Sequence, residues 1–417
     1  MNSPPAKTTM GRNVLLAAAV IILPVGSVPA QPPTRVALVG ATLIDGTGAA
    51  PIPNATILIE GARISAVGPR RAVVVPSGTT VIEVAGKYLL PGFIDLHMHL
   101  TIPVNRDRLQ TDSEATLRAI RFMEMFQRLG ITSIRDVAAP IEPMKAVAAA
   151  FGEGLGSAIR VFGVGQLITS TGGHGAGSHA GMEADGPVEF RKAVRTMHAN
   201  GFRHIKLSPT YTREEVEAAV DEARTLGMRI TSHGGGLSDT RPPSMTRLAV
   251  AAGVQSIEHV NEMGDDALDL IAAKGVAIIP TLAIYGHQYL ENKIPRELIE
   301  ARGWTQEIHE TLFRKAHQRG ITLGVGSDAV GDMMKLYPGL YFEEMRYFVK
   351  LGMTPLEAIV AATRNGGIVI GDRYGIGTLE PGKLADLQVL PGNPLESFDN
   401  LGNPELVMIG GRIRRFP

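Results

Sequence analysis

The stretch that decides the fold is Gly92-Phe-Ile-Asp-Leu-His-Met-His, which ends at His99. His97 and His99 are two residues apart, so on a β-strand both imidazoles point to the same face. Two imidazoles side by side on one face offer nitrogen ligands to a zinc-like ion. The stretch therefore predicts a strand that carries metal ligands at its end.

Further apolar runs along the chain alternate with helical stretches. The eight strand candidates are 93–99, 133–137, 160–168, 204–207, 229–233, 256–260, 277–282 and 322–328. Residues 113–129, 187–200, 212–226 and 265–274 have apolar residues at three-and-four spacing, and glycines follow the helices as stop signals. Thr212 and Glu215 match a capping box. Eight strand–helix units predict an α/β fold with a closed (β/α)8 TIM barrel. A doubly wound open sheet is the competing architecture, but no Gly-rich dinucleotide fingerprint follows the first strand.

Residues of metal-ligand type recur at the ends of these strands. Barrel enzymes carry their chemistry at the C-terminal ends of the strands. One histidine there is usually a packed core or rim side chain, whereas six ligand-type residues together indicate a metal centre. They are His97 and His99 on strand one, Lys206 on strand four, His233 on strand five, His259 on strand six and Asp328 on strand eight.

The two terminal segments have a different texture, with short alternating runs separated by turns. These runs are 36–44, 56–60, 63–67 and 80–84 at one end, and 385–390, 406–409 and 412–416 at the other. The first set reads as a small antiparallel sheet. Each set alone is too thin to bury a face. Residues 31–90 and 377–417 therefore predict two parts of one small β-sandwich domain, with the barrel over residues 91–376.

The first 30 residues resemble an export signal. Lys7 and Arg12 precede an unbroken apolar run over 14–23, and Val28-Pro29-Ala30 resembles a cleavage site. An uncleaved membrane anchor is the alternative, but the run is short for a bilayer. We expect a periplasmic or secreted protein without stable membrane insertion after signal cleavage.

The composition limits the partners. Lys+Arg and Asp+Glu balance at 41 each, which gives no electrostatic case for nucleic acid or an acidic membrane surface. The chain has no cysteine, so disulfides and thiolate ligands are excluded.

The motifs resemble those of the metal-dependent amidohydrolase superfamily. The resemblance runs from about Val36 to the C-terminus and rests on PGFIDLHMH (91–99), HIKLS around Lys206, TSH at His233, IEH at His259, GSD at Asp328 and GTLEPGKLADL (377–387). It implies two divalent ions bridged by a carboxylated Lys206. It further implies that His97, His99 and Asp328 bind one ion, and that His233 and His259 bind the other.

The chemistry of Lys206 agrees with this expectation. Burial can depress the pKa of a lysine by up to ~3–5 units. The neutral amine can then react with carbon dioxide and become an anionic oxygen ligand. The alternative is an ordinary ion pair of Lys206 with an acid such as Asp136.

The ions predict a hydrolytic mechanism. A metal lowers the pKa of bound water from 15.7 to about 7, and a hydroxide held between two ions can attack a carbonyl. Asp328 would accept the proton and deliver it to the leaving nitrogen, or serve only as a ligand. Zinc suits imidazole and carboxylate ligands, and manganese or cobalt would also be accommodated.

Two residues are candidates for substrate contact. Thr171-Gly-Gly-His-Gly175 follows strand three and resembles the branch with Xaa-Pro and Xaa-Arg dipeptidases, imidazolonepropionase-like proteins and ochratoxin-hydrolysing amidohydrolases. The resemblance implies a catalytic and substrate-binding role for His174; the alternative is a solvated histidine in a flexible glycine loop. Tyr285, just past strand seven, either lines the pocket or packs against its neighbours.

The leading functional hypothesis is hydrolysis of an amide in a small molecule, namely a dipeptide, an N-acyl amino acid or an ochratoxin-like amide. The compact stretch from Lys206 to His233 differs from the peptidase-like relatives, which leaves the substrate open. The alternatives are hydrolysis of cyclic amides, lactones or other esters, and a non-catalytic envelope protein that binds a metal or ligand. A deaminase is disfavoured because glycines follow His233 where an acidic residue is expected. Relatives often assemble, so we also expect a homo-oligomer.

Overall fold

The computed structural model describes residues 34–102, 111–153, 159–235, 244–261, 263–286, 297 and 305–416. The predicted signal segment, residues 1–30, lies outside the described residues. None of the helices in these ranges combines the length and the apolar character that a membrane crossing requires.

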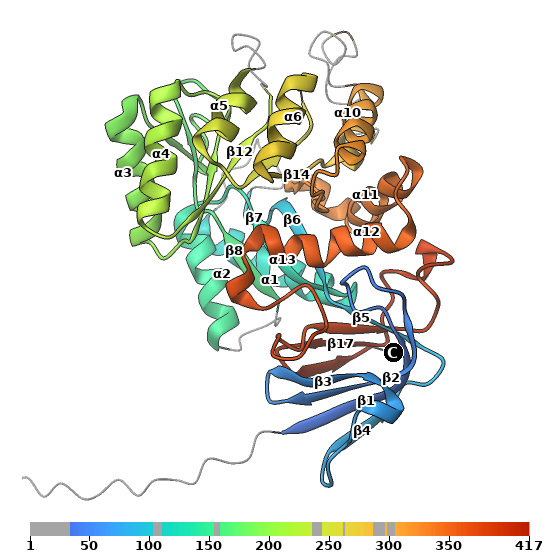
Figure 1. Cartoon of the computed structure of the whole chain (residues 1–417). Coiled ribbons are helices and arrows are strands. Elements are labelled where there is room, and N and C mark those ends of the chain that lie inside the picture. Colours follow the sequence, from blue (N-terminus) through green and yellow to red (C-terminus); the bar gives the residue numbers. More distant parts are fainter. Residues whose placement is uncertain are drawn as a thin grey trace, which may run out of the picture. The chain divides into compact units, whose positions relative to one another are not determined.

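Strands from both ends of the chain share one eight-stranded sheet, drawn in blue and dark red in Figure 1. Its strands are β1 (Arg35–Leu43), β2 (Ile52–Glu60), β3 (Arg63–Pro69), β4 (Thr80–Glu83), β5 (Tyr88–Pro91), β16 (Leu387–Leu390), β17 (Leu406–Ile409) and β18 (Arg412–Arg415). The order is β18-β17-β16-β5-β1-β2-β3, and β4 also pairs with β1. The two terminal segments, for which the sequence predicted one small β-sandwich, therefore combine in a single sheet.

The pairing in this sheet differs from the sequence-based expectation in one respect. β4 and β5 both run parallel to β1, so the N-terminal part is mixed and not purely antiparallel. Tight hairpins force antiparallel pairing, whereas the longer connection after β3, which includes η1 (Arg70–Ala72), allows the chain to return in the parallel direction. The expected sandwich takes the form of one continuous sheet, and β1 presents Leu38 to one apolar cluster and Ala37 and Val39 to another.

The middle of the chain forms a TIM-barrel-type α/β fold. A six-stranded sheet has the order β10-β9-β11-β12-β13-β14, and a four-stranded sheet has the order β15-β6-β7-β8; all of their pairings are parallel. The strands are β6 (Phe93–His99), β7 (Ile131–Asp136), β8 (Arg160–Gly163), β9 (Leu167–Thr169), β10 (Gly181–Glu183), β11 (His204–Leu207), β12 (Arg229–His233), β13 (Ser256–Glu258), β14 (Ala277–Ile279) and β15 (Ala329–Val330).

Two segments connect these sheets. The run 160–169 contributes β8 to one sheet and β9 to the other. On the other side Ile278 forms a parallel bridge with Leu323, and the Leu96 N–H donates to the Val325 carbonyl at 2.9 Å.

The prediction of an eighth strand over 322–328 is wrong. This segment forms only an isolated bridge, at Leu323. Asp328 has a left-handed φ of 49°, which interrupts the extended backbone before β15. A Cβ on Gly326 would lie 2.7 Å from the Cβ of His97, so glycine allows this segment to pass close to β6.

Helices pack on the outside of the parallel strands (Figure 1). They are α1 (Asp112–Arg128), α2 (Ile141–Glu153), α3 (Gly186–Ala199), α4 (Arg213–Thr225), α5 (Ser244–Ala252), α6 (Asp265–Lys274), α7 (Leu282–Gly286), α10 (Gln306–Gln318), α11 (Gly339–Lys350), α12 (Pro355–Ala362) and α13 (Arg364–Ile370), with short 3-10 turns η2 (Gly331–Leu336), η3 (Asp372–Tyr374) and η4 (Phe398–Asn400). The predicted capping box is confirmed: Thr212 and Glu215 exchange hydrogen bonds at the start of α4.

Candidate metal centre

Five of the six ligand-type residues predicted from the sequence lie in a parallel strand or directly after one. His97 and His99 close β6, Lys206 lies in β11 and His233 closes β12. His259 directly follows β13, and Asp328 directly precedes β15. The ends of parallel strands meet on one face of the fold, which brings these distant positions together.

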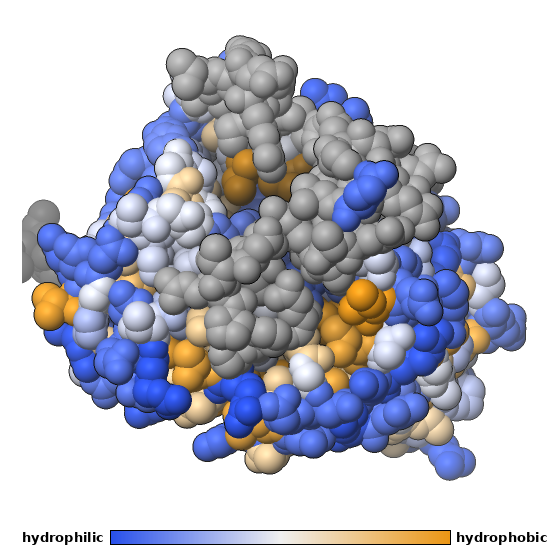
Figure 2. Space-filling model, turned by 90° about the horizontal axis from the view of Figure 1, so that it is seen from above, coloured by the Kyte–Doolittle hydropathy of each residue, from blue (hydrophilic) through white to orange (hydrophobic). Residues whose placement is uncertain are grey.

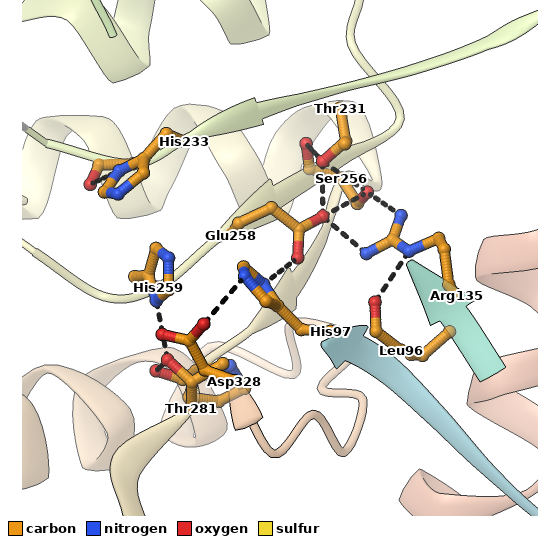
Figure 3. A network of polar contacts seen from close by, with 12 residues as sticks. Leu96, His97, Arg135, Thr231, His233, Ser256, Glu258, His259, Thr281 and Asp328 are labelled. Carbon is orange, nitrogen blue, oxygen red and sulfur yellow. Dashed lines mark hydrogen bonds and ion pairs between the residues drawn. The ribbon is translucent and has the colours of Figure 1, made fainter. Parts of the chain in front are cut away.

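The imidazoles and Asp328 form one cluster, of which Figure 3 labels His97, His233, His259 and Asp328. The ligand atoms of His97, His259 and Asp328 all lie within 4.8 Å of one another. The ring centroid of His259 lies 4.6 Å from that of His97 and 4.4 Å from that of His233. Oδ1 of Asp328 lies 3.4 Å from Nε2 of His97 and 3.3 Å from Nε2 of His99. The four histidines and Asp328 are therefore close enough to surround bound cations.

Hydrogen bonds to carbonyls define the tautomers of two histidines. Nδ1 of His99 lies 3.3 Å from the Ala138 carbonyl, and Nδ1 of His233 lies 3.2 Å from the Gly234 carbonyl. A carbonyl can only accept, so Nδ1 must carry the proton in both rings. Nε2 of each neutral ring then has its lone pair available.

The other two histidines follow the same rule with different acceptors. Nδ1 of His97 lies 2.8 Å from the Glu258 carboxylate, and Nδ1 of His259 lies 2.6 Å from Oγ1 of Thr281. The Thr281 hydroxyl donates to the Pro280 carbonyl, so its oxygen accepts from His259. All four histidines thus direct Nδ1 at an oxygen acceptor, which leaves Nε2 as the candidate ligand atom. This donor set fits divalent metal ions, which bind neutral imidazole whose second nitrogen is held by an oxygen.

Burial keeps most of these rings neutral. Desolvation and the nearby cationic groups hold the pKa of His97, His233 and His259 well below its usual value. Burial also opposes the charge on His99, but its hydrogen bond with Asp328 and the charge of that carboxylate leave the pKa of His99 raised. Neutral imidazole is the form that binds metal.

Lys206 is almost completely buried beside this cluster, with 3% of its surface exposed. Burial lowers its pKa to about 8, although the negative charge of Glu258 acts in the opposite direction. The alternative pairing with Asp136 does not form between these two described side chains. Asp136 instead accepts the N–H groups of Leu100 at 2.7 Å and Ala138 at 3.2 Å, and burial raises its pKa to about 7.

Three non-glycine residues of the centre have left-handed backbone conformations. The φ angles are 71° at His259, 53° at Thr281 and 49° at Asp328. Such conformations cost about 1–3 kcal/mol each and persist where the surroundings impose them, often at functional sites. Here they turn the chain at three neighbouring strand ends.

Asp95 fixes the segment that leads to Asp328. Its carboxylate accepts the Ser327 hydroxyl at 2.6 Å, the Ser327 N–H at 3.0 Å and the Tyr337 hydroxyl at 3.2 Å. The Asp328 N–H donates to the His97 carbonyl at 2.7 Å. Asp95 is fully buried, which raises its pKa to about 6 despite these hydrogen bonds.

The two substrate candidates both lie next to the histidine cluster. The ring of His174 is 5.0 Å from that of His233, and the ring of Tyr285, in α7, is 6.2 Å from that of His259. Tyr285 also stacks on His309 with a centroid distance of 3.8 Å, and its hydroxyl lies 3.0 Å from the amide of Asn261. Tyr285 therefore packs against His309 and also lies beside His259 of the metal centre. Figure 2 shows the molecule from above: the rim is mostly hydrophilic, with smaller groups of hydrophobic residues between the hydrophilic ones.

Sequence reasoning missed two buried charged residues beneath the cluster, Arg135 and Glu258. Both lie inside apolar runs, at 133–137 and 256–260. Opposite charges inside two buried strands are a signal for an internal ion pair, because a lone charge there is costly. Thr281 and Asp95 were also missed, since neither has a local pattern that indicates its partner.

The fold and this cluster define the chain as a hydrolase of the amidohydrolase type. The sequence profile of the amidohydrolase family matches residues 88–414, and the chain belongs to that family. It acts as a hydrolase on carbon–nitrogen bonds, in agreement with the relatives that it matches. Enzymes of this family are generally metal-dependent, and the cluster around His97 is a candidate site for such an ion.

Several individual proteins and solved structures are similar to this chain over most of its length. The chain is 27% identical over 435 residues to ochratoxinase from Aspergillus niger, covering 90% of this chain and 85% of that protein. It is 26% identical over 400 residues to imidazolonepropionase from Symbiobacterium thermophilum, covering 82% and 85%. A solved Xaa-Pro dipeptidase with bound methionine superposes with a TM-score of 0.81 at 25% identity, covering 92% of this chain and all of that one (100%). The crystal structure of A. niger ochratoxinase has the same fold, with a TM-score of 0.81 at 24% identity over 93% of this chain and 96% of that one.

Proposed function

We propose that the protein is a binuclear metal-dependent amidohydrolase that cleaves the amide bond of a dipeptide or an N-acyl amino acid, ochratoxin-like amides included. The observation that carries this proposal is the orientation of the four histidines. Each directs its Nδ1 at an oxygen acceptor, which leaves Nε2 as the atom that can bind a cation.

The residues would divide between two ions within a closed (β/α)8 barrel. His97, His99 and Asp328 would hold one ion, His233 and His259 the other, and a carboxylated Lys206 would bridge them. Zinc suits these ligands, and manganese or cobalt remain alternatives. Bound divalent ions would supply an activated water and polarise the substrate carbonyl.

The environment of Lys206 supports carboxylation. With its pKa lowered from 10.5 to about 8, roughly a tenth of the Lys206 side chains are neutral amines at pH 7, far more than for an exposed lysine. The amine nitrogen bonds to the carbon of carbon dioxide and releases one proton, which yields a carbamate anion. An anion at this position balances the cations that the histidines would hold.

The proton transfers fall to Asp328. Its carboxylate lies at the open side of the cluster, with 16% of the side chain exposed, whereas His97 is 1% exposed. It can take a proton from the attacking water and pass it to the leaving nitrogen, which requires reach more than an extreme pKa. His174 and Tyr285, beside His233 and His259, would orient the substrate.

Amide hydrolysis is favoured by relatives whose names state ochratoxinase and Xaa-Pro dipeptidase. Hydrolysis of a cyclic amide, lactone or other ester is the second candidate, favoured by the similarity to imidazolonepropionase. A non-catalytic envelope protein is set aside because the chain belongs to a family of hydrolases.

We also propose that the protein is exported to the periplasm or the medium, which the apolar run at 14–23 supports. Assembly into a homo-oligomer is part of the same proposal.

The test combines metal analysis of the purified protein with turnover of dipeptides, N-acyl amino acids and matched esters. We expect two ions per chain and release of free amino acid. We expect K206M to lose bound metal, and metal loading of the wild-type protein to increase with bicarbonate. One ion per chain, or full metal binding by K206M, would contradict the binuclear proposal.

A further inference from the structure

A buried carboxylate lies directly behind His97. Glu258, at the end of β13, has no exposed surface (0%). One oxygen, Oε2, accepts Nδ1–H of His97 at 2.8 Å. The other, Oε1, accepts the Thr231 hydroxyl at 2.5 Å and lies 3.4 Å from Oγ of Ser256. Both oxygens are therefore committed to partners inside the barrel, and the carboxylate has little freedom to turn.

Arg135 of β7 holds Glu258 from the side away from the cluster. Nη2 of Arg135 lies 2.5 Å from Oε1 of Glu258, and the guanidinium also donates to the Leu96 carbonyl at 2.7 Å and to Oγ of Ser256 at 3.2 Å. Arg135 is 2% exposed and so is as deeply buried as its partner. A buried charge pair is tolerated when both charges are matched and hydrogen-bonded, as they are here.

The contacts continue through His97 into the proposed metal site. Each residue of this chain contacts the next: Arg135 binds Glu258, Glu258 binds His97, and His97 faces Asp328 (Figure 3). The distance from Nε2 of His97 to Oδ1 of Asp328 is 3.4 Å. A neutral imidazole carries one N–H, and the carboxylate at Nδ1 keeps that proton on the side away from the site. Nε2 can then act only as an acceptor or a ligand.

His97 differs from the other three histidines in its acceptor. His99 and His233 donate to main-chain carbonyls, and His259 donates to the hydroxyl of Thr281. An anionic acceptor makes a stronger hydrogen bond than a neutral one and increases the basicity of the ring. His97 is thus the one ligand among these four whose affinity for a cation is increased by a full negative charge.

We propose that Glu258, held in place by Arg135, is a positioning residue that fixes the tautomer of His97 and strengthens binding of the ion that His97 shares with His99 and Asp328. This inference rests on the proposed metal site and concerns the affinity of one of its two ions. The alternative is that the pair serves only to stabilise the barrel.

Replacing Glu258 alone would leave Arg135 as an uncompensated buried charge, and the protein could unfold for that reason. The main variant is therefore R135M/E258M, which removes both charges and keeps apolar volume. The control is R160M/D386M, which removes an ion pair between the buried Asp386 and the partly exposed Arg160. Arg160 is the first residue of β8, at the opposite end of the strand from the metal ligands.

The measurement is stepwise removal of zinc by a chelator, together with thermal unfolding. The wild-type protein tests the proposed function, since it must bind two ions. We expect R135M/E258M to remain folded and to lose about 10–100-fold in affinity for one ion, with little change for the other. The control pair should leave both affinities unchanged.

Nitrogen NMR of histidine-labelled protein gives a second readout that a structural role would not move. In the metal-free wild-type protein we expect His97 to carry its proton on Nδ1, and in metal-free R135M/E258M we expect a mixture of tautomers. A folded double variant with wild-type affinities for both ions and an unchanged His97 signal would overturn the inference. A wild-type protein that binds neither zinc nor manganese nor cobalt would instead overturn the proposed function.

Discussion

Asp328 contacts both histidines of the first barrel strand: its Oδ1 lies 3.4 Å from Nε2 of His97 and 3.3 Å from Nε2 of His99. A carboxylate in this position can bind a cation together with the two rings, and it can also exchange a proton with a substrate. These two roles have different experimental consequences, because one concerns metal content and the other concerns turnover.

The variant D328N separates them. Asparagine keeps an oxygen of similar size but cannot accept a proton at neutral pH. If Asp328 transfers protons, we expect kcat to fall by about 10²–10⁴-fold while metal remains bound. Metal content of the purified variant and kcat on one amide substrate check this. Loss of metal in proportion to loss of turnover would indicate that Asp328 is only a ligand.

Thr281 offers a test of how a single hydroxyl supports a ligand. T281V removes the acceptor for the Nδ1 proton of His259 and leaves a buried donor unpaired, at a cost of about 1–3 kcal/mol. We expect zinc affinity to fall by about 10-fold. T281S keeps the hydroxyl and is the matched control. Equal zinc affinities in titrations of the two variants would show that the hydrogen bond has no effect on the ligand.

Tyr285 has two possible roles, and two substitutions distinguish them. Y285F keeps the ring stacked on His309 but removes the hydroxyl beside Asn261. If the hydroxyl contacts the substrate, we expect kcat/KM to fall by about 10-fold, the effect of one hydrogen bond of ~1.4 kcal/mol. The melting temperature should fall less than in Y285L, because only the acceptor of the Asn261 amide is lost. Y285L also removes the stacking and should lower the melting temperature. Full activity in Y285F would leave Tyr285 as a packing residue.

Glu344 makes stability depend on pH. It is fully buried in α11 and accepts the Ala283 N–H at 2.7 Å, and burial raises its pKa from 4.5 to about 8. The folded state therefore retains a proton that the unfolded state loses above pH 4.5. The contribution to stability is complete below pH 4.5 and is lost as the pH rises to about 8.

The variant E344Q removes this titration. We expect the melting temperature of the wild-type protein to fall more steeply than that of E344Q between pH 5 and about 8, with roughly 2–4 °C for each kcal/mol of stability. E307Q, at an exposed position of α10, is the control for the loss of one negative charge. Parallel melting curves for wild type and E344Q over this range would contradict the assignment.

The local sequence was sufficient to predict the positions of most of the barrel strands. The predicted bounds of the strands at 204–207 and 229–233 and of the helix at 265–274 agree with β11, β12 and α6. Apolar periodicity determines which side chains of a strand share a face, and a ligand-type residue at each strand end is visible in the same pattern. This is why the candidate ligands could be named before the structure was known.

Other features depended on contacts between distant residues. The segment 322–328 has the composition of a strand, but close packing of Gly326 against His97 and the left-handed φ of Asp328 limit it to one bridge. Likewise, no local pattern indicated that β4 and β5 would run parallel to β1, because that direction depends on the path of a long connection.

The sequence by itself determined the alternation of strands and helices and the residue types at the strand ends, because both follow from short-range periodicity. Only the tertiary structure decided which inward side chains meet. Arg135 and Glu258 are 123 residues apart, and His259 and Thr281 are 22 apart. Their pairing depends on the register of strands around the barrel, which is fixed by packing of the whole fold and by no single segment.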